Sequence, residues 1–113
     1  MKLLIVDDNK EVRKLLNSLF AQKAEQIFEC SDGQCAVESY EKYHPDYVLM
    51  DLEMKGMDGL TATEKIMNNN PGAKIIIVTS YNDPKLRKAG MSLGASAYVT
   101  KDNLIELEEI INK

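Results

Sequence analysis

The sequence predicts an α/β fold with a doubly wound, five-stranded parallel sheet. Between short apolar runs lie segments whose apolar residues recur at helical spacing. Strands that alternate with helices in this way favour a parallel sheet with right-handed crossovers. The 113 residues fit one domain that buries its own core, so we expect a single domain over residues 1–113. The five predicted strands are Leu3–Val6, Ile27–Cys30, Tyr47–Met50, Ile75–Val78 and Ala97–Val99.

The first two strand–helix units begin the pattern. Leu3–Val6 is a continuous apolar run, as expected of a strand whose two faces are both covered. The second run is interrupted by Glu29, and Ser31 and Gln34 follow at capping-box spacing, which predicts the start of the second helix. The first helix carries one apolar stripe at i, i+3, i+4, i+7 and i+8, formed by Val12, Leu15, Leu16, Leu19 and Phe20.

The remaining units carry their own helix-start signals. Asp58 is a candidate N-cap after the third strand, and Asp83 is one after the fourth strand, with Pro84 at the favoured first position. Asn103 and Glu106 have capping-box spacing after the fifth strand. The last two helices carry thinner apolar stripes, which are Leu86, Ala89 and Leu93 and then Leu104, Leu107 and Ile111.

Composition narrows the class of protein. Apolar residues make up 44% and charged residues 28%, a balance typical of a folded globular domain. No apolar run approaches the roughly 20 residues that span a membrane, and the start, MKLLIVDDN, does not resemble a signal peptide. We therefore expect a cytoplasmic location and no membrane contact. The net charge of −4 argues against direct nucleic-acid binding by this domain.

The two cysteines do not predict a metal site. Cys30 and Cys35 have no second pair, and only one histidine, His44, accompanies them. We expect them to be reduced, partly buried small residues rather than a redox pair.

Polar side chains follow four of the predicted strands at the point where each strand ends. Because the strands are parallel, these positions lie on one rim of the sheet, where ligands gather in such folds. Each residue has an ordinary interpretation by itself, since an acid can cap a helix or begin a solvated turn and a lysine usually lies in solvent. Their common rim favours one site. The rim residues are Asp7, Asp8, Asp51, Thr79, Ser80, Thr100 and Lys101.

Three clustered carboxylates repel one another unless a cation neutralises them. A hard divalent ion with oxygen ligands does so, most simply Mg²⁺, with Mn²⁺ as a second candidate. Such a site suits phosphoryl transfer. Asp51 would attack phosphorus and hold it as an acyl phosphate, while Thr79 would donate a hydrogen bond. Lys101 would neutralise charge on the transferred group.

With these residues the sequence resembles a receiver domain of two-component signalling, the family of the chemotaxis response regulator. The resemblance covers essentially the whole chain and rests on LLIVDDN, DYVLMDLEMKGMDG, IIIVTS and GASAYVTKD. It implies a (βα)5 flavodoxin-like fold with strand order 2-1-3-4-5. It also implies a phosphorylation-controlled switch, not a conventional enzyme, that takes its phosphoryl group from a sensor histidine kinase or a phosphotransfer protein.

The resemblance assigns roles to the acidic residues. Asp51 would be the phosphoacceptor. Asp8 and Asp51 would hold the Mg²⁺ directly, together with the backbone carbonyl of Glu53, and Asp7 would act through water.

The resemblance also implies how the signal leaves the site. Thr79 and Tyr98 would form a switch pair, Lys101 would contact the phosphoryl group, and the fourth helix, fifth strand and fifth helix would form the output surface. A downstream effector domain or protein would read that surface. The basic segment KLRK (85–88) and the acidic segment ELEE (106–109) could pair across a phosphorylation-linked homodimer, although solvated faces explain both segments equally well.

Three positions depart from the common family pattern. Lys55 stands where many members have proline, which should loosen the loop without removing a ligand. Asp102 follows Lys101 where proline is frequent, so a cis peptide bond is not assured there. Glu53 is unusual two residues after Asp51, and its carboxylate could reach Lys101 or crowd the path of an attacking water.

Three other functions would also suit parts of this sequence. A haloacid-dehalogenase-like, Mg²⁺-dependent phosphohydrolase also uses an aspartyl nucleophile, but in a D-x-D arrangement on its first strand, where this chain has Asp7-Asp8, and with a cap region. A flavin carrier needs a hydroxyl- or glycine-rich phosphate loop after the first strand, and this loop is acidic. A pseudo-receiver would bind partners without phosphate, although every residue needed for the chemistry is present.

Overall fold

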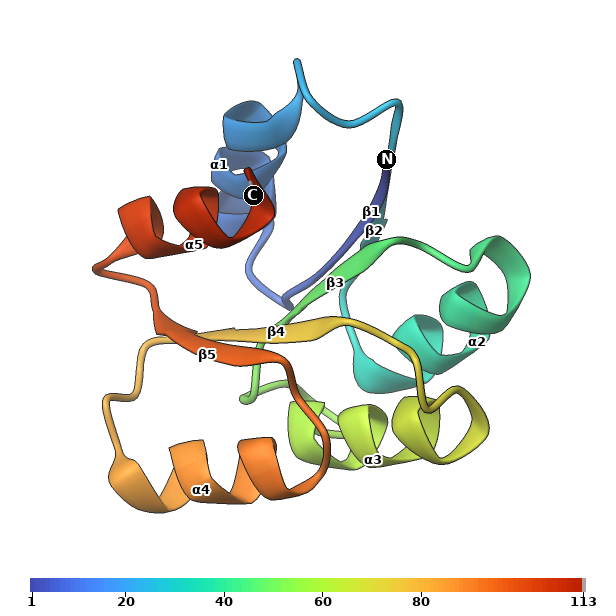
Figure 1. Cartoon of the computed structure of the whole chain (residues 1–113), viewed down its shortest axis with the longest axis vertical. Helices are drawn as coiled ribbons and strands as arrows, with labels where there is room; N and C mark the ends of the chain where they lie inside the picture. Colours follow the sequence, from blue (N-terminus) through green and yellow to red (C-terminus); the bar gives the residue numbers. More distant parts are fainter. Residues whose placement is uncertain (113) are drawn as a thin grey trace.

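The computed structural model describes residues 1–112 and confirms the predicted sheet (Figure 1). Five strands pair in parallel in the order β2-β1-β3-β4-β5. Each strand agrees with its predicted range to within one residue at either end. The strands are β1 (Lys2–Val6), β2 (Gln26–Cys30), β3 (Tyr47–Met50), β4 (Ile75–Thr79) and β5 (Ala97–Thr100).

Five helices connect and cover the strands, so the fold is doubly wound as predicted. Helices α1 and α5 lie on one face of the sheet, and α2, α3 and α4 lie on the other (Figure 1). Among residues 1–112, none of the helices combines the length and the apolar character that a membrane span requires. The helices are α1 (Lys10–Phe20), α2 (Gly33–Tyr43), α3 (Gly59–Asn69), α4 (Pro84–Ser92) and α5 (Leu104–Ile111).

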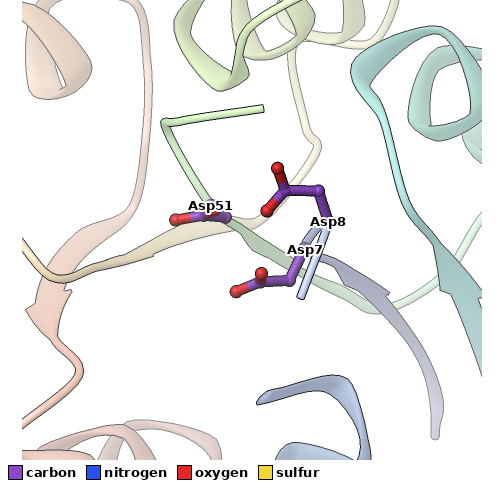
Figure 2. Close-up of side chains that lie close together, drawn as sticks. All are labelled: Asp7, Asp8 and Asp51. Atoms are coloured by element: carbon purple, nitrogen blue, oxygen red, sulfur yellow. The ribbon is translucent and has the colours of Figure 1, made fainter. Parts of the chain in front are cut away.

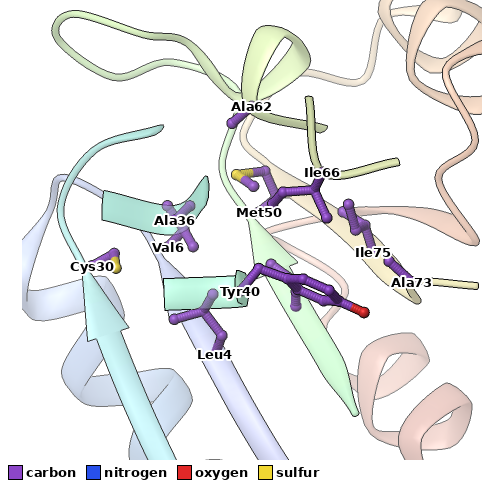
Figure 3. Close-up of a cluster of buried hydrophobic side chains, with 11 residues drawn as sticks. Leu4, Val6, Cys30, Ala36, Tyr40, Met50, Ala62, Ile66, Ala73 and Ile75 are labelled. Carbon is purple, nitrogen blue, oxygen red and sulfur yellow. The ribbon is translucent and has the colours of Figure 1, made fainter. Parts of the chain in front are cut away.

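The core lies on both faces of the sheet because successive strand residues point to opposite sides. Leu3 and Ile5 of β1 pack with buried residues of α1 and α5. Leu4 and Val6 of the same strand pack with buried residues of α2 and α3 (Figure 3). All four side chains are at most 1% exposed, which explains why the first strand is apolar throughout.

Two predicted features of the first helices are wrong. Leu15 is 50% exposed, because it lies about 100° around the helix axis from Leu16, which faces the sheet. At the start of α2 the N-cap is Asp32 rather than Ser31, and its carboxylate accepts a hydrogen bond of 2.8 Å from the backbone N–H of Cys35. The predicted capping box of Ser31 and Gln34 is therefore absent, since the extended turn continues one residue further than the spacing implied.

The other helix starts follow the prediction more closely. Asp58 caps α3 and Asp83 caps α4, with Pro84 as the first helical residue. Asn103 occupies the N-cap of α5 but makes no side-chain capping hydrogen bond, so the capping box with Glu106 is not formed. The backbone N–H of Glu106 instead donates to the backbone carbonyl of Asn103 at 3.2 Å.

The expectation of reduced cysteines is also wrong. Cys30, at the end of β2, and Cys35, in the first turn of α2, are joined by a disulfide. The turn between strand and helix brings their Cα atoms to 5.6 Å, within the range that a disulfide bridges. The short separation in sequence does not reveal this fold-back, because the path of the turn depends on how α2 docks against the sheet.

Candidate functional site

The site begins at the carboxyl ends of the two neighbouring strands β1 and β3. Val6 and Met50 are paired in register at these ends, so the residues that follow them emerge side by side. The backbone N–H of Asp51 donates to the carbonyl of Val6 at 2.9 Å. The sheet therefore fixes Asp51 directly beside the double acid that follows β1 (Figure 2).

The three aspartates form one cluster, as the sequence predicted. Carboxylate oxygens of Asp7, Asp8 and Asp51 all lie within 4.8 Å of one another. Asp7 is 1% exposed and Asp51 is 5% exposed, whereas Asp8 lies at the surface. The carboxylates of Asp7 and Asp51 are thus shielded from water. Negative charges repel one another more strongly in the protein interior than in water.

The burial of Asp51 and the negative charges close to it change the pKa of its carboxyl group. Burial and, to a smaller extent, the charge of Asp7 raise the pKa of Asp51 to about 6, although Lys101 acts in the opposite direction. A positive ion at the cluster would relieve the repulsion. An oxygen-only set of carboxylates suits a hard divalent cation such as Mg²⁺.

Lys101 supplies a positive charge that compensates the carboxylates. It follows β5, the edge strand of the sheet, directly. Its Nζ lies 2.8 Å from Oδ2 of Asp7 and 3.3 Å from Oδ1 of Asp51. Burial opposes the charge on the ammonium, but the hydrogen bond to Asp7 and the charge of Asp51 outweigh it, so the pKa of Lys101 is raised. No cis peptide bond occurs in residues 1–112, so the bond from Lys101 to Asp102 is trans.

The hydroxyl at the rim belongs to Thr79, the last residue of β4, which is fully buried. Its Oγ1 accepts a hydrogen bond of 3.2 Å from the backbone N–H of Tyr81, and its carbonyl accepts one of 2.7 Å from the backbone N–H of Lys101. Thr79 is therefore joined through the backbone to the rim lysine. Ser80, the next residue, is exposed.

Tyr98 is buried in the structure, with 2% of its surface exposed. Its hydroxyl donates to the carbonyl of Tyr81 at 2.6 Å, so the buried phenol has the partner that it requires. The guanidinium of Arg87 on α4 lies 4.8 Å from the ring centroid, a cation–π contact. Tyr81 thus contacts both members of the predicted switch pair, Thr79 through its N–H and Tyr98 through its carbonyl.

Glu53 does not reach Lys101. Its carboxylate accepts a hydrogen bond from the phenol hydroxyl of Tyr81, and this bond raises the pKa of Tyr81. Glu53 also lines a small depression together with Asp8 and Lys55, so this residue lies close to the acidic cluster. The contact was missed because the loop that carries Tyr81 has no periodic pattern that places its side chain.

Two further residues, Gly59 and Arg13, contribute to the geometry of the site, although the sequence pattern did not predict a role for either. Gly59, the first residue of α3, approaches the carbonyl of Asp51 so closely that a Cβ at this position would overlap it. Arg13 on α1 donates through Nη1 to the carbonyl of Asp7 at 2.7 Å and pairs with Glu29 of β2. The Asp58-Gly59 dipeptide could have marked the close approach, whereas nothing in the sequence marked Arg13.

Comparisons with known proteins agree with this geometry. A family model described as "Response regulator receiver domain" matches residues 3–112. The chemotaxis protein CheY of Halobacterium salinarum is 38% identical over 100 residues, which cover 88% of this chain and 83% of that protein. An uncharacterized transcriptional regulatory protein of Bacillus subtilis, YhcZ, is 40% identical over 113 residues, and the match covers 98% of this chain but 52% of YhcZ. This chain thus spans about half the length of that relative.

Comparison with a solved structure also supports a receiver fold. The CheX–CheY–BeF3–Mg²⁺ complex from Borrelia burgdorferi superposes on this chain with a TM-score of 0.87 at 27% identity, covering 99% of this chain and 87% of that one. Sequence, fold and acidic cluster agree, which rules against the phosphohydrolase alternative. The chain belongs to the response regulator receiver domain family, whose members are phosphorylation-controlled signalling domains rather than conventional enzymes.

Proposed function

We propose that Asp51 is the phosphoacceptor of this domain and that it takes its phosphoryl group from a phosphohistidine of a sensor kinase or a phosphotransfer protein. One observation carries the proposal. Asp51 is a buried carboxylate at the end of a central strand, with Asp7 and Asp8 beside it and the ammonium of Lys101 at 3.3 Å. A carboxylate in this setting is too costly to bury without a use or a partner.

The residues have complementary roles in the transfer. An oxygen of Asp51 forms a bond to phosphorus while the bond between phosphorus and the donor nitrogen breaks, which leaves an acyl phosphate and a free histidine. With a pKa of about 6, Asp51 is largely ionised at neutral pH and can attack. Lys101 neutralises charge on the phosphoryl oxygens, and the hydroxyl of Thr79 donates a hydrogen bond to one of them.

A divalent cation, Mg²⁺ or Mn²⁺, fits the donor set. Asp8, Asp51 and the backbone carbonyl of Glu53 would hold it directly, and Asp7 would act through a water molecule. When bound, the ion would supply positive charge against the equatorial oxygens of the transferring group. The exposure of Asp8 leaves room for the several waters that Mg²⁺ usually retains.

Phosphorylation would act on the surface through Thr79 and Tyr98. Both side chains form hydrogen bonds with the backbone of Tyr81. A movement of the Thr79 hydroxyl toward the phosphoryl group would therefore shift the loop that anchors Tyr98. Tyr98 lies on β5, between α4 and α5, and the surface of these three elements would carry the output.

The proposed setting is a single receiver unit, residues 1–113, that works in the cytoplasm. The partner that reads it is an effector domain or a separate protein. YhcZ, at about twice the length of this chain, is a transcriptional regulatory protein, so an attached effector is one arrangement found among relatives. With a net charge of −4, this domain would leave any nucleic-acid contact to the effector.

The proposal is tested by incubating the protein with a small acyl-phosphate donor and Mg²⁺ and measuring its intact mass. Wild type should gain one phosphoryl group and Asp51→Asn none, whereas Asp102→Asn, an exposed acid outside the cluster, should behave as wild type. Equal phosphorylation of wild type and Asp51→Asn would contradict the assignment. A wild type that gains no phosphate would favour the pseudo-receiver alternative.

A further inference from the structure

The disulfide between Cys30 and Cys35 closes a small ring where β2 passes into α2. Cys30 is the last residue of β2 and is 3% exposed, while Cys35 lies in the first turn of α2 and is only partly buried. The bond therefore has one sheltered sulfur and one that a reagent can approach. Between the two cysteines lie residues 31–34, which comprise the turn and the first two residues of α2.

This turn forms one wall of the acidic site. The backbone carbonyl of Cys30 accepts a hydrogen bond of 3.0 Å from the backbone N–H of Asp7. Two residues of the ring, Ser31 and Asp32, line a depression of about 560 Å³ together with Asp8, Asn9 and Lys55. The ring is thus bonded to one acid of the cluster and faces another.

The surroundings of the sulfurs suit exchange. The hydroxyl of Ser39, one turn further along α2, lies 3.3 Å from Sγ of Cys30 and 3.8 Å from Sγ of Cys35. Such a hydroxyl can donate a hydrogen bond to a thiolate, the form in which a sulfur leaves or attacks in exchange. Cys35 also lies at a helix N-terminus, which favours a negative charge on its sulfur.

We propose that Cys30 and Cys35 form a reversible thiol–disulfide site that exchanges with small thiols and disulfides, and whose state sets how firmly the β2–α2 turn holds Asp7. In reduction, a thiolate such as that of glutathione attacks Sγ of Cys35, and the bond to Cys30 breaks. Cys30 leaves as a thiolate beside Ser39 and takes up a proton. A second thiolate then releases Cys35, giving two protein thiols and one molecule of glutathione disulfide.

Oxidation is the reverse sequence, with glutathione disulfide as the electron acceptor. In the reducing cytoplasm proposed above, disulfides are usually transient or redox-active rather than permanent, which agrees with a reversible pair. The site lies outside the phosphoryl chemistry, because neither sulfur takes part in it. Its effect on the acidic cluster passes through the hydrogen bond between the backbones of Cys30 and Asp7.

The first test equilibrates the protein in stepwise ratios of reduced to oxidised glutathione, alkylates free thiols and measures the intact mass. Wild type should change from two labels to none across the series. Two labels at every ratio, or none under the most reducing conditions, would overturn the proposal. Cys35→Ser cannot close the ring and should keep one thiol or carry one glutathione. The titration needs neither a phosphoryl donor nor Mg²⁺, so the redox result and the phosphorylation result can fail independently.

The second test asks whether the redox state reaches the acidic site. Amide hydrogen exchange is compared in the oxidised and reduced forms, with Ile77 of β4 as an internal reference for global stability. Reduction should speed exchange at the amide of Asp7 by about threefold or more relative to Ile77, because the turn that accepts its hydrogen bond is released. Equal relative rates in the two forms would contradict the coupling.

Discussion

Nζ of Lys101 lies 2.8 Å from a carboxylate oxygen of Asp7, and that carboxylate is almost completely withdrawn from water. The same ammonium also contacts Asp51, so one lysine from the end of β5 neutralises two acids from the ends of β1 and β3. The contact joins three strands at the rim of the sheet. It follows that Lys101 stabilises the fold in addition to its proposed contact with the phosphoryl group.

Replacing Lys101 should therefore destabilise the protein. Lys101→Met keeps the length of the side chain but leaves Asp7 and Asp51 buried without a counter-charge, and we expect a loss of about 1–3 kcal/mol in the free energy of unfolding without divalent cations. Urea denaturation measures it, with Lys88→Met on the exposed face of α4 as the control. Mg²⁺ should recover part of the loss. Equal stability of Lys101→Met and wild type would show that the ion pair contributes nothing to folding.

The raised pKa of Asp51 predicts a stability that depends on pH. The folded-state pKa of about 6 exceeds the ordinary value of 3.8, so the folded protein binds more protons between these values. The contribution of Asp51 is therefore favourable at low pH and is lost as the pH rises through about 6. Asp51→Asn should be more stable than wild type at neutral pH, by about 1–2 kcal/mol.

This prediction is checked by urea denaturation of wild type and Asp51→Asn at about pH 4.5 and about pH 7.5 without divalent cations. The difference between the two proteins isolates Asp51 from the other acids that titrate. The advantage of the variant should be larger at the higher pH. An advantage that grows as the pH falls would show that the pKa of Asp51 is lowered rather than raised.

Binding of Mg²⁺ should stabilise the folded state and raise the melting temperature, because the cluster exists only in the folded protein. The effect should be weaker in Asp8→Asn, which removes an exposed ligand without disturbing the core, and unchanged in Glu64→Gln on the surface of α3. Thermal unfolding over a series of Mg²⁺ concentrations measures it. An identical rise in melting temperature in wild type and Asp8→Asn would place the cation elsewhere.

The strands and the acidic rim were predictable from the sequence because both depend on local order along the chain. A buried apolar run ends where polar residues begin, and parallel strands bring these ends to one edge, so the sequence alone predicts Asp51 beside Asp7. Side-chain contacts between loops could not be predicted in this way. The carboxylate of Glu53 accepts a hydrogen bond from Tyr81, in the loop after β4, rather than contacting Lys101.

The errors at the first two helices have the same origin. The periodicity of α1 includes Leu15 and Leu16, but only docking against the sheet decides which edge of the stripe stays exposed. The N-cap of α2 is Asp32 rather than Ser31, because one more residue is extended before the helix begins. The same turn places Cys30 within bonding distance of Cys35. Such choices follow from tertiary packing and leave no trace in residue spacing.

Phosphorylation-linked dimerisation remains a prediction. The segments KLRK (85–88), at the start of α4, and ELEE (106–109), in α5, carry opposite charges and could pair across a symmetric dimer. Sedimentation with and without beryllofluoride, a phosphoryl mimic, should show dimers only with the mimic, and salt should weaken them. A monomer in both states at high protein concentration would leave the two segments as solvated faces.

Thr79 is predicted to carry the signal from Asp51 to Tyr98. The ring of Tyr98 is already buried without a phosphoryl group, so phosphorylation should shift a population rather than create a new conformation. The shift is limited by the hydrogen bond from Thr79 to a charged oxygen, worth about 1.5–3 kcal/mol. Thr79→Ala should still accept phosphate but lose most of the change in α4 and α5.

NMR chemical shifts of α4 and α5 with bound beryllofluoride measure this coupling in wild type and Thr79→Ala. Ser80→Ala, one residue further along and exposed, is the matched control and should respond as wild type. Matching shifts in wild type and Thr79→Ala would mean that the signal takes another route.

The most direct test of the account identifies the residue that carries the phosphoryl group. An acyl phosphate on aspartate is reduced by borohydride to homoserine, whereas a free carboxylate is not, so peptide mass spectrometry after treatment locates the modified residue. After phosphorylation in Mg²⁺, the account predicts homoserine at position 51 and unchanged aspartate at positions 7 and 8. Homoserine at Asp7 or Asp8, with Asp51 unmodified, would contradict it.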